Sequence, residues 1–148
     1  MISALPHEAI VRVILAQAAP NQAAYLVGGA VRDLLLQQPG HDLDISVSNH
    51  AIGLARRTAN ALGAAFYVMD EERDIARVVL GEGSERLFVD FAGFRDHSLE
   101  EDLRGRDFTL NAMALSLAQP DRLIDPLGGA ADLHQRVLRL CSPTAISD

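Results

Sequence analysis

A short apolar run, a pair of glycines and a helical pattern follow one another early in the chain. Residues 25–27 (Tyr-Leu-Val) predict a strand, Gly28-Gly29 a tight turn, and residues 30–37 a helix. Residues 42–48 then alternate acidic and apolar side chains, as a half-buried strand does. A strand, a turn and a helix that lead directly into a second strand predict an α/β domain.

The rest of the chain adds further elements of both kinds. Apolar residues at helical spacing predict a helix from Pro6 to about Ala18, and Asn49 is a candidate N-cap for a helix that ends at Gly63. The apolar residues of 110–117 recur at i, i+3, i+4 and i+7, which predicts another helix. The remaining predicted elements are strands over residues 65–69, 75–80, 87–91 and 123–124 and a helical turn over residues 131–135. We therefore expect one α/β (α+β) domain with about five or six strands.

Length and composition limit the class of protein. The chain has 148 residues, 49% of them hydrophobic, which suits one domain with its own core. No segment approaches the roughly 18 uncharged apolar residues of a membrane span, so we expect a cytoplasmic protein without a membrane partner. Cys141 is the only cysteine, which rules out an internal disulfide, and the five histidines are too scattered for a zinc site.

The basic residues are also informative, because all thirteen are arginines. The sequence therefore lacks the phosphate-binding lysine of a P-loop and any lysine base or nucleophile. The net charge of −7 repels a polyanion overall. Contact with nucleic acid would have to be local, assisted by a metal ion, or made by another part of a longer protein.

The sharpest local feature is Asp42-Leu43-Asp44. Residues two apart in a strand point to the same face, so the two carboxylates lie side by side. Like charges at this spacing favour a bound cation, and Mg²⁺ takes one or two protein carboxylates while water and phosphates complete its shell. The alternative is that both acids lie at a solvated strand end.

A third carboxylate is predicted on a later strand. Leu87, Val89 and Phe91 form one apolar face, which turns Asp90 to the opposite face. If that strand lies beside the strand of Asp42, three carboxylates converge and could hold the two metal ions of in-line phosphoryl transfer. The alternative is that Asp90 faces solvent on a half-exposed sheet.

The glycine pair is a candidate phosphate contact. Small residues let backbone N–H groups approach an anion where the following helix begins, and Arg32 lies on its first turn. The run matches neither the Rossmann pattern nor the P-loop pattern, and a double glycine is also a common packing device. The glycine pair indicates a phosphate contact only in combination with the nearby carboxylates.

Five blocks, in this order, resemble the head domain of bacterial class II tRNA nucleotidyltransferases and poly(A) polymerases. The blocks are residues 26–36 (LVGGAVRDLLL), 41–44 (HDLD), 90–95 (DFAGFR), 99–114 (LEEDLRGRDFTLNAMA) and 124–129 (IDPLGG). Together they span about residues 25 to 140, nearly the whole chain.

The resemblance implies a DNA polymerase β-like nucleotidyltransferase fold, with a central mixed sheet of about five strands flanked by helices. It implies Mg²⁺-dependent transfer of AMP or CMP from ATP or CTP to the 3′-hydroxyl of tRNA or another RNA. The catalytic metal ligands that it implies are Asp42, Asp44 and Asp90. The nucleotide-binding residues that it implies are Gly28, Gly29, Arg32, Arg106, Asp107 and Asn111. Of these, Arg106 and Asp107 would contact the ribose, and Asn111 would lie on the helix that follows.

The sequence departs from the family pattern in three places. Gly105 stands where the family has the first arginine of an Arg-Arg-Asp motif. Only three residues separate Arg95 from Leu99, a short loop that favours a CC-adding or otherwise restricted member. The family continues beyond residue 148 into base-recognition, body and tail domains, so we expect residues 1–148 to form the head and about 141–148 to begin the neck.

Other functions stay open at this point. The same site could polymerise poly(A) or transfer the nucleotide to an acceptor other than RNA, because aspartates do not distinguish acceptors. It could also bind nucleotides without transferring them. The residues that select the base lie beyond residue 148, and we expect this chain alone to be weakly active or inactive.

Overall fold

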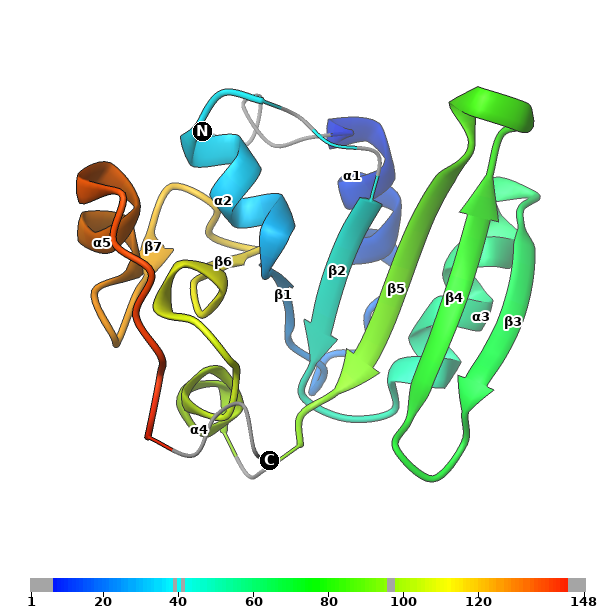
Figure 1. The fold of residues 1–148 in the computed structure, drawn as a ribbon. Helices are drawn as coiled ribbons and strands as arrows, with labels where there is room; N and C mark the ends of the chain where they lie inside the picture. Colours follow the sequence, from blue (N-terminus) through cyan, green and yellow to red (C-terminus); the bar gives the residue numbers. More distant parts are fainter. Residues whose placement is uncertain (1–6, 39, 41, 96–97, 144–148) are drawn as a thin grey trace.

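The computed structural model describes residues 7–38, 40, 42–95 and 98–143. Seven strands form one mixed sheet in the order β3-β4-β5-β2-β1-β6-β7 (Figure 1). The strands are β1 (Ala24–Val27), β2 (Asp42–Val47), β3 (Ala65–Asp70), β4 (Ile75–Leu80), β5 (Leu87–Gly93), β6 (Ala114–Ser116) and β7 (Leu123–Ile124). The helices are α1 (Glu8–Gln17), α2 (Gly29–Leu35), α3 (Ala51–Leu62), α4 (Leu99–Arg104) and α5 (Gly129–Gln135), with 3-10 turns η2 (Gly83–Glu85) and η3 (Thr109–Asn111).

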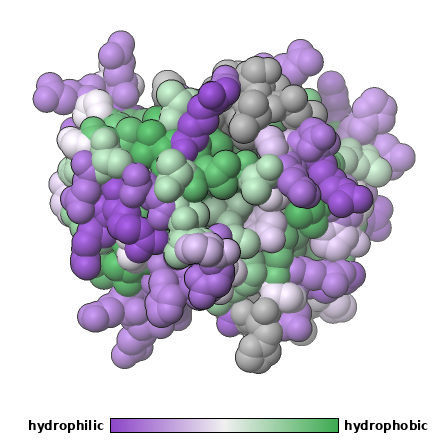
Figure 2. Space-filling model, turned by 180° about the vertical axis from the view of Figure 1, so that it is seen from behind, coloured by the Kyte–Doolittle hydropathy of each residue, from purple (hydrophilic) through white to green (hydrophobic). Residues whose placement is uncertain are grey.

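One face of the sheet packs against helices and forms the main core. Helices α1 and α3 lie behind the sheet in Figure 1, and their buried residues join the inward residues of β2, β4 and β5 in one apolar cluster. Leu43, Ile45 and Val47 on β2 are almost fully buried in it. On the outer surface of this side, hydrophilic residues surround hydrophobic residues that run across the middle (Figure 2). The alternation of β2 therefore leaves its acidic residues on the other face.

The other face is only partly covered. A smaller cluster, in which Leu103 of α4 joins Val27, Ala112 and Ala114, covers it over β1 and β6. Over β3 the same face is open, and Tyr67 and Met69 are 55% and 53% exposed. The predicted mixed sheet flanked by helices is confirmed, with seven strands in place of five or six.

The predicted helix over residues 110–117 is wrong. Residues 109–111 form η3, and β6 pairs antiparallel with β1, with Leu115 opposite Leu26. Ala112 and Ala114 face the small cluster, whereas Met113, Leu115 and Leu117 face the main core. Because this strand is buried on both faces, its apolar run is continuous and coincides with helical spacing. Asn111 consequently lies on a 3-10 turn and not on a helix.

Two helix starts differ from prediction. The side chain of Asn49 does not cap α3; the Asp74 carboxylate accepts from the backbone N–H groups of Ala51 and Ile52 at 2.7 and 2.9 Å. Helix α4, which was not predicted, is capped by Ser98, whose hydroxyl accepts from the Glu101 N–H. The predicted helix start at Pro6, the stop at Pro39 and residues 96–97 of the short loop lie outside the described residues.

Within the described residues, no helix is both long enough and apolar enough to cross a membrane.

Candidate functional site

The predicted adjacency of the two acidic strands is confirmed. Strands β2 and β5 pair in parallel, and the register sets Asp44 opposite Asp90 and Asp42 opposite Phe88. Because side chains alternate along each strand and Leu43 and Val89 enter the core, Asp42, Asp44 and Asp90 share the open face. Burial raises the pKa of Asp44 above its usual value, and the neighbouring Asp90 raises it further, while Arg106 opposes the rise.

The third carboxylate is held by an arginine that the sequence reasoning missed. Arg77 on β4 lies opposite Asp90 and donates from Nε and Nη2 to its two oxygens at 2.8 and 3.0 Å. The Arg77 guanidinium also lies 4.7 Å from the centre of the Phe88 ring. The clue was available, because a hairpin that turns through residues 81–86 pairs Leu80 with Leu87 and therefore Arg77 with Asp90.

The donor set of β2 suits a hard cation. Asp42 and Asp44 offer carboxylate oxygens on one face, and burial together with the neighbouring acids raises the pKa of Asp44, so that a bound cation would favour its ionised form. Among the residues that the structure describes, no three acidic, histidine or cysteine side chains converge closely enough to hold a metal ion. Both carboxylate oxygens of Asp90 accept hydrogen bonds from Arg77.

The glycine turn lies against the carboxylates. Gly28 has φ +68° and ψ −141°, a conformation that L side chains rarely adopt. A Cβ there would lie 3.5 Å from Asp44 Oδ2 and 3.5 Å from Arg106 Nη1. At Gly29 a Cβ would lie 3.1 Å from Arg32 Nη2. The backbone conformation thus favours glycine at position 28, and the missing Cβ at position 29 lets Arg32 lie close to the backbone.

Arg32 and Asn111 are brought together although 79 residues separate them in sequence. Arg32 Nη1 donates to Asn111 Oδ1 at 3.1 Å, and its Nε donates to Asp33 at 3.2 Å. The guanidinium is therefore fixed beside the glycine turn.

Arg106 is anchored by a buried acid that sequence reasoning also missed. Its Nη2 lies 3.4 Å from both Ser46 Oγ and Asp102 Oδ2, and its Nε is buried without a hydrogen-bond partner. Asp102 is 4% exposed and also accepts from the backbone N–H of Arg95 at 3.1 Å. The available signal was an acid four residues before the arginine, with Asp102 on α4 and Arg106 just beyond its end.

Asp107 lies at the edge of this arrangement. It is exposed, and its carboxylate accepts from the Phe108 N–H at 2.7 Å. Its backbone carbonyl accepts from the Cys141 N–H at 2.8 Å. Burial and the nearby Asp107 charge raise the pKa of the Cys141 thiol.

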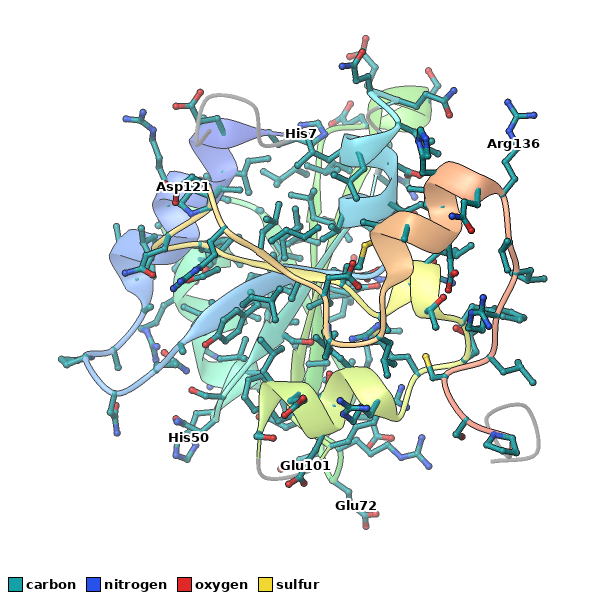
Figure 3. The ribbon with its side chains drawn as sticks, turned by 90° about the vertical axis from the view of Figure 1, so that its left-hand side faces the viewer. His7, His50, Glu72, Glu101, Asp121 and Arg136 are labelled. Atoms are coloured by element: carbon teal, nitrogen blue, oxygen red, sulfur yellow. The ribbon has the colours of Figure 1, made fainter. Side chains whose placement is uncertain are left out.

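A hollow of about 800 Å³ adjoins the site beyond Ser46, where β2 and β5 end. Arg95, Asp102 and Arg106 line one side, and the β3–β4 turn with Glu72 lines the other. Figure 3 shows Glu72 and Glu101 at the same end of the molecule. The hollow is therefore bounded by charges of both signs.

Comparison with known sequences identifies the family of this chain. The Poly A polymerase head domain family matches residues 24–139. The CC-adding tRNA nucleotidyltransferase of Geobacter sulfurreducens is 50% identical over 125 residues, which cover 84% of this chain and 28% of that protein. The A-adding tRNA nucleotidyltransferase of Deinococcus radiodurans is 47% identical over 119 residues, which cover 80% of this chain and 26% of that protein. The chain thus spans little more than a quarter of these relatives.

Solved structures share the fold. A CCA-adding enzyme in an apo form aligns with a TM-score of 0.82 at 33% identity, over 95% of this chain and 34% of its own. A tRNA nucleotidyltransferase complexed with a primer tRNA and an incoming ATP analog aligns with a TM-score of 0.77 at 35% identity, over 94% of this chain and 41% of its own.

Proposed function

Because this chain belongs to the poly(A) polymerase head domain family, we propose that it is the catalytic head of a tRNA nucleotidyltransferase. It transfers AMP or CMP from ATP or CTP to an RNA 3′-hydroxyl and releases pyrophosphate, in the cytoplasm. The observation that carries the proposal is the shared face of Asp42, Asp44 and Asp90 beside Gly28. Residues 1–148 form the head, and the neck begins at about residue 141.

Asp42 and Asp44 would hold Mg²⁺, with Asp90, oriented by Arg77, as a third ligand. When bound, such ions neutralise charge on the reacting phosphates and on the departing pyrophosphate. The side-by-side β2 carboxylates support this role, because burial and neighbouring acids already raise the pKa of Asp44. Asp90 orients the acceptor hydroxyl and takes up its proton.

The nucleotide would lie on the β1 side of the carboxylates. There the Gly28-Gly29 backbone approaches the triphosphate, and Arg32 and Arg106 neutralise it. Asn111 holds Arg32, and Asp102 holds Arg106, so both guanidinium groups are oriented before the nucleotide arrives. Asp107 would accept a hydrogen bond from the ribose 2′-hydroxyl. Gly105 leaves one contact of the family motif unmade.

Two restricted activities, CC addition and A addition, differ in the nucleotide that they use. The short Arg95–Leu99 segment favours CC addition, and the Geobacter relative bears that name. The Deinococcus relative bears the name of an A-adding enzyme at nearly the same identity, so overall similarity does not choose between them.

A chimera provides the test. Residues 24–139 replace the matching head of the Geobacter enzyme, and labelled CTP and ATP are offered with tRNA that lacks its terminal nucleotides. We expect Mg²⁺-dependent incorporation that is lost in Asp42→Ala. A folded chimera that binds tRNA and nucleotide but incorporates neither label contradicts the proposed transfer.

A further inference from the structure

We propose that the single-stranded 3′ end of the acceptor RNA lies across the open faces of β3, β4 and β5, on an acceptor platform formed by Tyr67, Arg77, Arg86 and Phe88. This inference rests on the proposed function and names where its second substrate binds.

In-line displacement fixes the direction of approach. The attacking and leaving oxygens lie on opposite sides of the reacting phosphorus. Of the proposed triphosphate contacts, Gly28 and Arg32 flank the carboxylates on the β1 side of β2, and Arg106 lies over β2 at Ser46. The acceptor hydroxyl must then arrive from the other side of β2, where β5, β4 and β3 follow in order.

That side carries groups suited to a single strand. A hollow of about 600 Å³ is lined by Tyr67, Arg77, Arg86 and Phe88 together with small and aliphatic residues. Tyr67 is 55% exposed and sits opposite Arg77 in the strand register. Exposed aromatic rings and planar guanidinium groups stack on bases of any sequence, and arginine also neutralises phosphates.

The platform is continuous with the carboxylates. Arg77 contacts the Phe88 ring on one side and both Asp90 oxygens on the other. Arg77 is paired with Asp90, so in a chain of net charge −7 the exposed Arg86 supplies the local positive charge in this hollow that an RNA backbone complements. A base stacked at Tyr67 would thus place the following 3′-hydroxyl toward Asp90.

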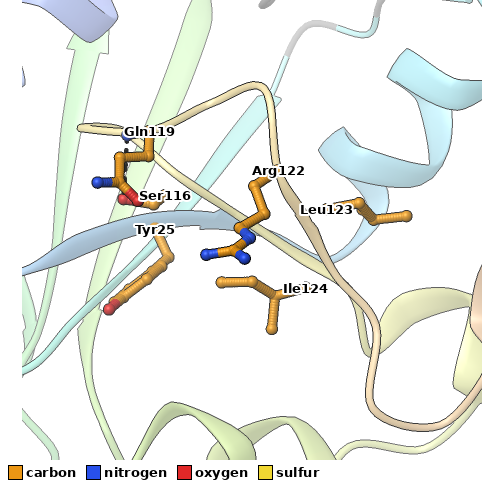
Figure 4. Close-up of a pocket in the computed structure, with 6 residues that line it drawn as sticks. All are labelled: Tyr25, Ser116, Gln119, Arg122, Leu123 and Ile124. Carbon is orange, nitrogen blue, oxygen red and sulfur yellow. Dashed lines mark hydrogen bonds between the residues drawn. The ribbon is translucent and has the colours of Figure 1, made fainter.

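A second hollow on the same face offers a direct comparison. It has a volume of about 440 Å³ and lies over β1, β6 and β7, where Tyr25, Arg122 and Ile124 line it (Figure 4). This hollow is on the nucleotide side of β2, so in-line geometry excludes it as the path of the acceptor. Arg122 therefore serves as a matched control arginine.

The test measures binding of a fluorescein-labelled hexaribonucleotide to the 148-residue chain by anisotropy over a range of salt. We expect Tyr67→Ala to raise the Kd for the RNA by about tenfold. We expect Arg86→Ala to lower the slope of log K against log salt by about 0.7. Arg122→Ala should leave both quantities unchanged. Equal affinity in all variants, loss of affinity in Arg122→Ala alone, or no RNA binding by the unsubstituted chain overturns the inference.

Two further measurements separate this inference from its premise. A 4-thiouridine at the penultimate position of the RNA should crosslink to peptides from β3 and β5, and crosslinks confined to β6 and β7 would overturn the platform.

Binding of fluorescent ATP and CTP analogues with Mg²⁺ should be equal in Tyr67→Ala and the unsubstituted chain. If the unsubstituted chain binds neither analogue, the result counts against the proposed function. The RNA crosslinks then test the acceptor platform independently. Sedimentation that shows a dimer dissociated by Tyr67→Ala also overturns the inference.

Discussion

Asp44 and Asp90 are register partners on adjacent parallel strands, and their side chains share the open face of the sheet. Burial raises the pKa of Asp44, and proximity to Asp90 raises it further. The two acids thus store unfavourable charge at the place where a metal-dependent transfer would need it.

This stored charge predicts a pH dependence. The pKa of Asp44 is raised in the folded state, so the folded protein binds this proton more tightly than the unfolded chain does. The stabilisation is complete below the unfolded pKa of 3.8 and is lost as pH rises through the higher folded pKa. Asp44→Asn should therefore unfold at a higher temperature than the unsubstituted protein at pH 7 without divalent metal, with a smaller difference at pH 4. Calorimetry at both pH values checks this, and a lower melting temperature at pH 7 would contradict it.

The cap of α3 gives a stability prediction with a matched control. Asp74→Asn keeps a side chain that tolerates the local φ of +59° but replaces one of the two acceptors with an NH₂ group. We expect a loss of about 1 kcal/mol in urea unfolding. Asn49→Ala, at the residue that the sequence suggested as the cap, should cost less than about 0.5 kcal/mol. The reverse order would show that Asp74 is not the effective cap.

Gly129 is predicted to tolerate no side chain. A Cβ there would lie within van der Waals overlap of the Thr109 carbonyl, which is backbone and cannot swing aside. Gly129→Ala should cost about 3 kcal/mol or more, because η3 and α5 must separate. Gly105→Ala is the control, since its Cβ would meet its nearest atoms at an ordinary 3.6 Å. Equal melting temperatures for the two variants would refute the packing argument.

The Arg77–Asp90 pair should matter more for transfer than for stability. Both side chains are about one-third exposed, at 34% and 31%, so solvent screens the pair. Arg77→Met should change the free energy of unfolding by less than about 1 kcal/mol while reducing single-turnover transfer in the chimera. Arg77→Lys, which keeps the charge but not the two-pronged contact, should recover transfer only in part. Full transfer activity in Arg77→Met would show that Arg77 has no role in transfer.

The sequence was sufficient where one local pattern had one structural solution. The alternation of Asp42 and Asp44 with core residues, and of Asp90 with Val89 and Phe91, correctly predicted which face each acid takes. The glycine turn and the helix after it were also predicted correctly.

Features that depend on tertiary partners were missed. β6 is buried on both faces, so its residues show no alternation in polarity, and the helical spacing of 110–117 was accidental. The cap of α3 comes from Asp74, more than 20 residues away along the chain. Arg77 lies outside the motif blocks and Asp102 lies inside one without an assigned role, and pairing across a hairpin and the packing of α4 bring them to the site.

The central claim is that Asp90 acts on the acceptor and not on nucleotide binding. The most direct measurement compares Asp90→Ala with the unsubstituted head in the chimera, by titrating Mg²⁺–CTP and by following single-turnover addition to tRNA. We predict nucleotide affinity within about threefold, since Gly28 and Arg32 lie on the β1 side, and a fall in the transfer rate of at least about 10³. Unchanged transfer in Asp90→Ala would contradict the account.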